Sequence, residues 1–266
     1  MTYLFDPSNW EWLTSGNNLR FLFEGFLVNV EIAVISMVLA LILGLVLALL
    51  SLSKNRLVHL VARGWVDVWR NLPLIFILLG FALALPSEIY TQWENLAPDF
   101  LPPAFQVGRV IAGIMGLVIY NSAVMAEIMR AGIVSLERGQ GEAAQALGLR
   151  YWQSMRLIIL PQGLRRMVPA TVSQLITLNK DTTLISIIAI REVVRHAKTI
   201  TNANPFLGDF VKGPPLQVYL VVGIMFIIVN LLLSRLSRRL ELKQRRETGV
   251  TIEPVSGLED QVAAPA

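Results

Sequence analysis

The sequence predicts an all-α membrane protein with five transmembrane helices. Two observations carry this prediction. Only 16% of the 266 residues are charged, against about a quarter in a typical soluble domain, and the apolar residues are gathered into long runs. The mean hydropathy of +0.57 agrees with them. A third observation refines the fold class: the fourth long segment contains a lysine and an aspartate, so we expect that helix to be interrupted.

Five segments are candidate bilayer spans. The first is free of charge, and at about 1.5 Å per residue it is long enough to cross a hydrocarbon core of about 30 Å. The second extends backwards through Trp65 to Trp69, and Pro73 is expected to kink it. The third is short, which places Arg109 or Glu127 near one of its ends. In chain order the five segments are 32–53, 71–86, 110–126, 167–190 and 214–234.

Lysine and arginine side chains set the expected orientation. With the N-terminus outside, the loops after the first and third segments are cytoplasmic, as is the basic stretch from Arg235 to Arg246, and these regions hold most of the cations. The positive-inside rule therefore favours an extracytoplasmic N-terminus and a cytoplasmic C-terminus. We expect an extracytoplasmic segment at 1–24, a transmembrane domain at 25–241 and a cytoplasmic tail at 242–266, which is polar, unpatterned and expected to be disordered.

Composition and motifs exclude several classes of site. The chain has no cysteine, so a disulfide framework and a thiolate metal site are ruled out. His59 and His196 are far apart and are expected in solvated loops, so no metal site is predicted. The phosphate-binding pattern G-x-x-x-x-G-K-[ST] is missing, so the chain is not expected to hydrolyse ATP or to be an enzyme. Nothing in the sequence indicates nucleic-acid binding.

A short Ala-rich module at about 135–163 separates the third and fourth segments. Residues 142–147 favour a helix, and Gly148 is placed to end that helix in the left-handed conformation. A second short helix is predicted from about Tyr151 to Ile159, stopped or kinked by Pro161. Small alanines beside apolar anchors are typical of a protein interface, although an amphipathic loop on the membrane surface is the alternative. The apolar anchors are Leu147, Leu149, Tyr151 and Trp152.

The spacing in this module resembles the cytoplasmic motif of ABC-importer permeases. Glu142, Ala143 and Ala144 are followed after three residues by Gly148, and nine residues later comes Ile158-x-Leu160-Pro161. In that family the loop forms coupling helices that sit in a groove of the ATP-binding subunit. The resemblance therefore implies contact with an ATPase for Glu142, Ala143, Ala144, Gly148, Leu149, Tyr151, Leu160 and Pro161.

Further stretches resemble the permeases of polar amino-acid importers, the histidine, glutamine, glutamate, arginine and opine type. They are WRNLPLIF (69–76), 120–144, LNKDTTLISIIAIREV (178–193) and LSRLSRRLE (233–241), and the similarity covers 25–241. The resemblance implies a multi-pass protein of a prokaryotic cell membrane that imports a polar amino acid, with glutamate or glutamine favoured. It also implies three partners: a dimeric ATPase that binds ATP-Mg, a second permease chain, identical or different, and an extracytoplasmic solute-binding protein. No cofactor is expected in this chain.

The interrupted fourth segment is the expected substrate site. A charged residue at the centre of a spanning helix costs about 2.5–3.5 kcal/mol, so Lys180 and Asp181 are not expected to face lipid. Either the two form a structural ion pair, or the helix breaks there and its polar groups line a cavity. In the second case Asp181, Thr182 and Thr183 begin a half-helix whose N–H groups face a substrate carboxylate. Asn179 and Lys180 would add donors.

Other polar residues leave alternatives open. Asn121, inside the apolar third segment, either lines the pathway or makes an interhelical hydrogen bond. Glu127 and Arg130 form either a surface ion pair or part of a gate. The rival functions are a permease for another small solute, a stand-alone carrier or channel, and a membrane scaffold. A carrier would call for an internal repeat and buried ionisable relays, and the sequence has neither.

Overall fold

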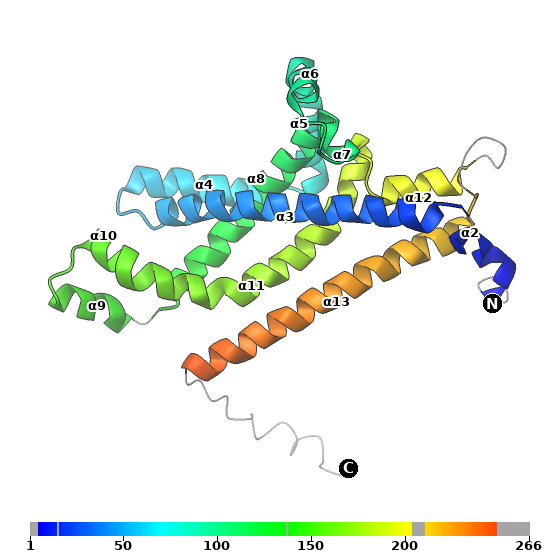
Figure 1. Cartoon of the computed structure of the whole chain (residues 1–266). Helices are drawn as coiled ribbons and strands as arrows, with labels where there is room; N and C mark the ends of the chain where they lie inside the picture. Colours follow the sequence, from blue (N-terminus) through cyan, green and yellow to red (C-terminus); the bar gives the residue numbers. More distant parts are fainter. Residues whose placement is uncertain (1–4, 15, 137, 204–210, 249–266) are drawn as a thin grey trace, which may run out of the picture.

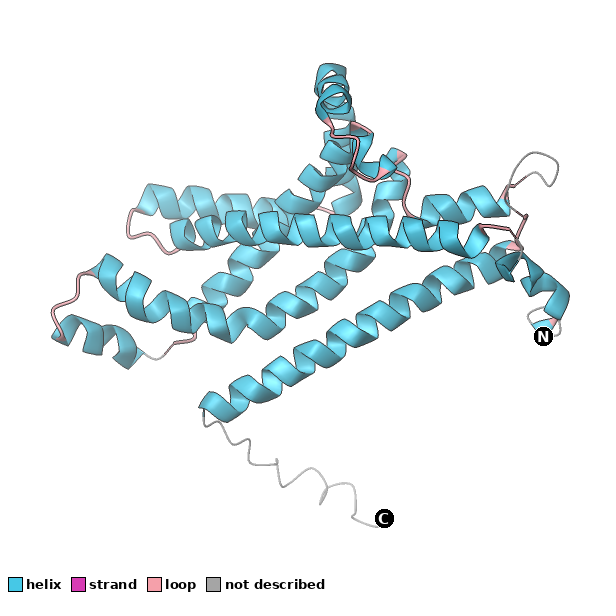
Figure 2. Ribbon diagram, in the orientation of Figure 1, coloured by secondary structure: helices cyan, strands magenta, loops and turns pink. Residues whose placement is uncertain are grey.

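The computed structural model describes residues 5–14, 16–136, 138–203 and 211–248. Within these residues it consists of helices and loops without a strand (Figure 2), which confirms the all-α class. In chain order the elements are η1 (Pro7–Trp10), α2 (Glu11–Thr14), α3 (Asn18–Ser51), α4 (Arg56–Asn71), α5 (Leu74–Ala84), α6 (Ser87–Leu96), α7 (Pro103–Gln106), α8 (Arg109–Val134), α9 (Arg138–Ala146), α10 (Tyr151–Ser154), the π-helical turn η2 (Met155–Ile159), α11 (Leu160–Asp181), η3 (Thr182–Ile188), α12 (Val193–Thr201) and α13 (Pro215–Thr248).

The long helix α3 shows how the apolar runs divide between protein and lipid. Its buried face carries small or flexible side chains, which allow α8 to pack along it. The opposite face exposes a branched apolar residue at every fourth position, and such a stripe suits a lipid environment. The buried face includes Ala33, Met37, Ala40 and Ala48, and the exposed stripe is Val34, Val38, Ile42, Val46 and Leu50.

Three helices of the described chain are long and apolar enough to cross a membrane. They are α3, α8 and the Pro215–Lys243 part of α13, and α4 with α5 would make a fourth if that bent pair is one span. α11 has sufficient length, but it carries Arg165, Arg166, Lys180 and Asp181. The structure thus accounts for three or four of the predicted spans, and the count of five stays a prediction, as does the orientation of the termini.

The second predicted span is sharply bent. α4 and α5 meet at an angle of 102°, and the break falls at Leu72 and Pro73, between the end of α4 and the start of α5. Proline has no N–H to donate and disfavours a helical conformation in the residue before it, so the predicted effect of Pro73 is confirmed. α5 and α6 therefore project sideways from the bundle (Figure 1).

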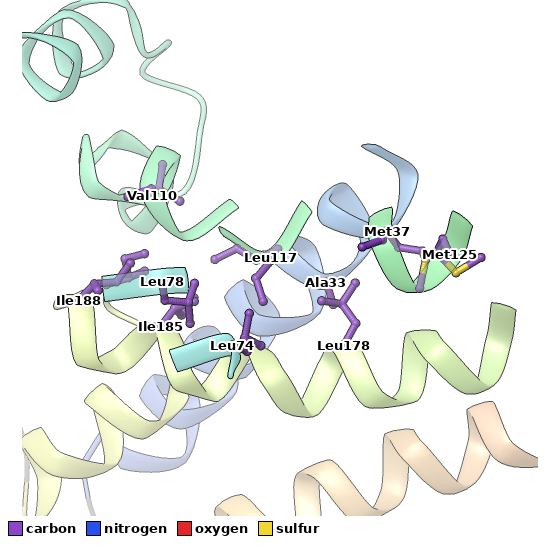
Figure 3. Close-up of a cluster of buried hydrophobic side chains, with 14 of the residues drawn as sticks. Ala33, Met37, Leu74, Leu78, Val110, Leu117, Met125, Leu178, Ile185 and Ile188 are labelled. Atoms are coloured by element: carbon purple, nitrogen blue, oxygen red, sulfur yellow. The ribbon is translucent and has the colours of Figure 1, made fainter. Parts of the chain in front are cut away.

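Two hydrophobic clusters hold the helices together. The larger one joins α3, α5, α8, α11 and η3, and Figure 3 shows Leu74 and Leu78 of α5 facing Leu117, Ile185 and Ile188. The smaller one joins α2, the start of α3, α12 and α13. The two clusters place α12 and α2 at one end of the molecule, and α9 and α10 lie at the opposite end (Figure 1).

The helix that begins at Tyr151 does not stop at Pro161. It passes from α10 through the π-turn η2 into α11 and ends only at Asp181. Pro161 lies in the first turn of α11, directly after the π-turn. A π-turn shifts the hydrogen bonding from i+4 to i+5. The helix can therefore continue although Pro161 has no N–H to donate. Of the two predicted effects of Pro161, the stop was therefore wrong, and the kink stays a prediction.

The fourth segment is interrupted, but in a different manner from the one predicted. At Thr182 the α-helix tightens into the 3-10 helix η3, and the N–H of Thr182 still donates to the carbonyl of Leu178, as in the α-helix before it. Asp181 makes no side-chain cap. The predicted half-helix beginning at Asp181, Thr182 and Thr183 is therefore wrong. The chain reverses later, at Ala189 with φ 67°, and a new α-helix begins at Val193.

Several predicted ends differ from the observed helices. The third predicted segment is contained in α8, which begins at Arg109 and runs on past Glu127. The fifth, apart from its first residue, is contained in α13, which begins at Pro215 and continues to Thr248. The tail at 242–266 was predicted to be disordered, which was wrong for 242–248, because α13 continues to Thr248; the remainder, 249–266, lies outside the described part of the chain. His59 lies on α4 and His196 on α12, so the prediction that both occupy loops was wrong.

Candidate functional site

The module between α8 and α11 contains a tight turn centred on Gly148. Gly148 has φ +75°, the left-handed conformation that the sequence predicts. The N–H of Leu149 donates to the carbonyl of Ala144 at 3.1 Å, and the N–H of Leu147 donates to that of Ala143 at 3.1 Å. The first of these bonds is the one that closes a Schellman motif. The turn therefore fixes where α9 ends and the direction in which the chain leaves it.

Apolar side chains around this turn are exposed. Leu147 is 77% and Trp152 69% exposed, and Tyr151 and Leu157 are also open to the surroundings. Ala144, by contrast, is fully buried. Lys54 lies 4.8 Å from the ring centroid of Tyr151, so the α3–α4 corner contacts α10. The turn is thus held in place by contacts with the rest of the chain, while its aromatic and aliphatic side chains stay exposed.

The structure places the other predicted coupling residues around the same turn. Arg150 precedes α10, and its N–H donates to Gln153 Oε1 at 2.9 Å, so glutamine supplies a cap in the first turn of α10. Glu142, Ala143, Gly148 and Pro161 are exposed, whereas Leu149 and Leu160 are half-buried. All eight predicted residues thus lie on α9, on α10, in the loop between them, or at the start of α11.

The predicted substrate residues lie at the far end of the same continuous helix. Asn179 and Thr182 are buried, Lys180 is exposed, and Asp181 and Thr183 are half-buried. Asn179 donates to Asn230 Oδ1 of α13 at 3.2 Å, while its own Oδ1 is buried without a partner in the described part of the chain. The hydroxyl of Thr183 donates to the carbonyl of Lys180 at 2.8 Å.

Lys180 and Asp181 do not form an ion pair. Within the described ranges the ion pairs are Arg20–Glu24, Arg63–Glu127 and Arg130–Glu127, so neither Lys180 nor Asp181 has an opposite charge within 4.0 Å. Consecutive residues of an α-helix point about 100° apart, which explains why the two side chains diverge. The contacts expected of a structural pair are therefore missing.

A buried polar network beside Thr182 was not predicted. Glu192 is fully buried and caps α12: its carboxylate accepts from the N–H groups of Val194 at 3.0 Å and Arg195 at 2.9 Å. Asn29 of α3 donates both to Glu192 Oε2 and to the hydroxyl of Thr182, each at 3.0 Å. Asn29 Oδ1 in turn accepts from the N–H of Val193 at 3.1 Å. The network ties α3, η3 and α12 together at the chain reversal.

Asn121 makes the interhelical contact that was one of its two alternatives. It is fully buried and accepts a hydrogen bond from Gln174 of α11 at 2.9 Å. Its amide donates to the carbonyl of Leu117 at 2.8 Å. With both groups of the side chain engaged, Asn121 joins α8 to α11.

Glu127 and Arg130 form the predicted ion pair, with Arg130 Nε 3.0 Å from Glu127 Oε2. The sequence did not indicate that Arg63 of α4 would join them, with its Nη1 3.2 Å from the same oxygen. The cluster therefore connects α4 to α8.

Comparison with known proteins decides the family. Residues 40–246 match the family of binding-protein-dependent transport system inner membrane components. The chain belongs to this family. It is a transmembrane ABC-importer permease of the polar amino-acid type, and permease subunits of such transporters are not themselves catalytic. The family as a whole works with an ATP-binding subunit and a binding protein and is integral to the inner membrane.

Permeases that are named for amino-acid transport match most of this chain in sequence. It is 37% identical over 230 residues to the probable glutamine ABC transporter permease protein GlnP of Bacillus subtilis, covering 86% of this chain and 96% of that protein. It is 34% identical over 233 residues to the glutamate/aspartate import permease protein GltK of Escherichia coli O157:H7, covering 86% and 97%. The arginine transport system permease protein ArtQ of Bacillus subtilis is 30% identical, with 85% and 93% covered.

Two solved structures share the fold. A crystal structure of an amino acid ABC transporter with histidines superposes with a TM-score of 0.66 at 27% identity, covering 86% of this chain and 94% of that one. An inward-facing MetNI methionine ABC transporter gives a TM-score of 0.64 at 17% identity, covering 83% and 94%. At that lower identity the second match shows the fold alone.

Proposed function

We propose that this permease forms half of the membrane pathway of an ATP-driven importer for a polar amino acid, with glutamate or glutamine favoured. A separate ATPase drives it by binding the exposed turn around Gly148, which we call the coupling turn. A second permease chain completes the pathway. An extracytoplasmic solute-binding protein delivers the substrate. The names of the relatives support this substrate class, since glutamine and glutamate/aspartate permeases are among them.

The observation that carries the proposal is that one continuous helix links the coupling turn to the residues Asn179 to Thr183, which we call the polar segment. One helix runs from Tyr151 to Asp181, a length of about 45 Å at 1.5 Å per residue. Leu147 and Trp152 expose their side chains at one end of it, and Asn179 to Thr183 lie at the other. A force applied by an ATPase at the turn would therefore reach the polar segment through the same continuous helix.

The polar segment offers groups suited to an amino-acid substrate. Asp181 lacks a cationic partner in the described chain and is suited to the α-ammonium, while Lys180 can face the carboxylate. Asn179 Oδ1 is a buried acceptor without a partner among the described residues, and a substrate N–H would satisfy it. Because Thr182 continues the hydrogen bonding of α11, free helix N–H groups take no part in this proposal.

Replacing Gly148 by valine tests the coupling. A β-branched side chain at φ +75° is strained whatever space surrounds it, so the turn must rearrange. We expect Gly148→Val to reduce co-purification of the ATPase, or to leave ATP hydrolysis uncoupled from uptake, in a chain that still folds. Gly64→Val is the matched control, because Gly64 lies on α4, has no positive φ and has nothing within 4 Å of an added Cβ.

Normal uptake by Gly148→Val would disprove the coupling proposal. The same assay bears on the orientation, because an ATPase in the cytoplasm can reach α9 and α10 only if this loop is cytoplasmic. An ATPase that co-purifies normally and protects other surfaces, leaving Trp152 open to chemical modification, would contradict that orientation as well.

A double substitution tests the substrate segment. If Lys180 and Asp181 bind the amino acid, Lys180→Met with Asp181→Leu should abolish uptake while expression and ATPase association survive. If the two are structural partners, the double variant should be tolerated better than either single change, because removing both charges leaves none unpaired. Uptake of radiolabelled glutamate or glutamine into proteoliposomes measures the difference, and wild-type uptake by the double variant would exclude the substrate role.

A further inference from the structure

A cavity lies beside α12. The helix α12 lies at the end of the molecule opposite to α9 and α10 (Figure 1). The cavity volume of about 560 Å³ lies within the usual range of small-molecule sites, about 300–1,000 Å³. α3, α7 and α12 all contribute to its walls. The polar wall consists of Arg191, Arg195, His196 and Thr199, and the apolar wall of Phe21, Pro103 and Ala104.

The two arginines of this cavity have no carboxylate partner within the described chain. The ion pairs in that part of the molecule involve Arg20, Arg63 and Arg130, and Glu24 is engaged by Arg20 at 2.8 Å. Glu192 stands between the two arginines in sequence, but it is buried and its oxygens accept from backbone N–H groups and Asn29. Two guanidinium groups around one cavity repel each other, and an anion between them would relieve that repulsion.

The position of the two arginines on the helix adds to the uncompensated positive charge of the cavity. Arg191 comes just before the N-cap of α12, and Arg195 lies in its first turns. The N-terminus of a helix carries a partial positive charge, so cations are disfavoured there. Arg195 gains some compensation from the buried Glu192, while the exposed guanidinium heads stay available to a ligand. The cavity is therefore arranged for an anionic group.

His196 gives the cavity a different kind of group. Its ring stacks on Phe21, with centroids 3.7 Å apart and planes 3° apart, and its Nδ1 donates to the Phe21 carbonyl at 2.7 Å. Burial lowers the pKa of His196 below its ordinary value, although the Phe21 carbonyl and Glu24 act in the opposite direction. A neutral ring that donates through Nδ1 keeps Nε2 as an acceptor, which suits an ammonium group.

We propose that this cavity is an outer recognition subsite for an acidic amino acid, whose carboxylates bind Arg191 and Arg195. Arginine binds carboxylates with two parallel hydrogen bonds, which gives geometric selectivity. The cavity would repel the side chain of a cationic amino acid, and His196 would accept from the α-ammonium. The inference rests on the proposed import function and assigns the class of substrate. The subsite shares no residue with the polar segment at Asn179 to Thr183.

Equilibrium binding of radiolabelled L-glutamate tests the subsite. The permease would be purified with its ATPase in phosphatidylcholine nanodiscs, without a binding protein. Arg191→Gln combined with Arg195→Gln should weaken binding by about tenfold or more, since charge-assisted hydrogen bonds are lost. L-glutamine should lose less affinity, because it has one carboxylate. Lys198→Gln is the matched control: it removes the same charge from the same helix outside the cavity, and its affinity should stay within about twofold of wild type.

The outcomes separate this inference from the proposed function. If the wild type imports glutamate but the double arginine variant binds it with unchanged affinity, the subsite is disproved and the import function stands. If the wild type imports no amino acid, the import function itself fails. Import restricted to cationic amino acids would overturn the assigned class. Phosphatidylglycerol retained by the wild type and lost by the variant, with glutamate affinity unaltered, would show a lipid phosphate site instead.

Discussion

The chain reversal at Glu192 and the coupling turn at Gly148 differ in the kind of side chain that each one buries. Around Glu192, polar groups are buried, and Asn29, Thr182 and the N–H groups at the start of α12 satisfy one another. Around Gly148, polar groups are exposed, and it is the apolar side chains of Leu147 and Trp152 that lack cover. The first region satisfies its polar groups within the chain, and for the second we propose that a partner protein covers the exposed apolar side chains.

The difference indicates what each region does. Buried hydrogen-bond networks are costly to break, so the reversal keeps α3, η3 and α12 in one arrangement. Exposed aromatic and aliphatic anchors gain free energy only when a partner covers them. Substitutions should therefore act on the stability of the chain at the reversal and on partner binding at the coupling turn. The free energy of unfolding of the chain alone is the measure that separates them.

The largest loss of stability is expected at Glu192. Glu192→Leu removes the acceptor of the half-buried N–H groups of Val194 and Arg195 and one acceptor of the buried amide of Asn29, which should cost about 3 kcal/mol. Glu192→Gln keeps one carbonyl oxygen and should lose less. Denaturation in detergent micelles, followed by tryptophan fluorescence, measures both. Glu88→Leu, at an exposed position of α6, is the control and should change stability by less than about 0.5 kcal/mol. Equal stability of Glu192→Leu and wild type would refute the structural role of the network.

A smaller loss is expected where α12 meets α3. A Cβ on Gly25 would lie 2.6 Å from His196 Nδ1 and 3.0 Å from the Cα of Val193, so Gly25→Ala must push α12 away from α3. Overpacking of this kind costs about 1–3 kcal/mol. Gly64→Ala has nothing within 4 Å and should be neutral or slightly stabilising, because alanine favours a helix. The same unfolding assay compares the two, and a Gly25→Ala chain as stable as Gly64→Ala would mean that the contact yields without cost.

The local turn at Gly148 could be predicted from sequence, and the contacts between residues far apart in the chain could not. The left-handed turn at Gly148 was predictable because a helix-ending glycine acts within a few residues of the chain. The pairing of Glu192 with Asn29 joins positions 163 residues apart, and glutamate is not a preferred N-cap type, so nothing local signals it. Arg63 was missed for the same reason, since it meets Glu127 across 64 residues.

The wrong predictions share a physical cause. Pro161 was expected to stop or kink a helix, and Thr182 was expected to begin one, because each residue type has that tendency in isolation. In the structure a π-turn directly before Pro161 lets the helix continue. At Thr182 the helix tightens, and its N–H stays bonded to the residue four positions before it. Small changes of helical hydrogen bonding thus override a single residue's preference, and a hydrophobicity pattern does not show them.

The smallest effect on stability, and the clearest effect on binding, is expected at Trp152. This side chain is 69% exposed and contacts the ring of Tyr151, so Trp152→Ala should change the stability of the chain by less than about 0.5 kcal/mol. A buried tryptophan at the centre of an interface contributes about 2 kcal/mol or more, so affinity for the ATPase should fall about 30-fold. Trp65→Ala is the matched control, since Trp65 is also exposed but lies on α4 beside Trp69. Titration of the detergent-solubilised chain with its ATPase measures the affinities. If Trp152→Ala and Trp65→Ala bind equally well, the uncovered side chains at Gly148 do not form the ATPase contact. The contrast between the two regions would then reflect only which side chains face lipid.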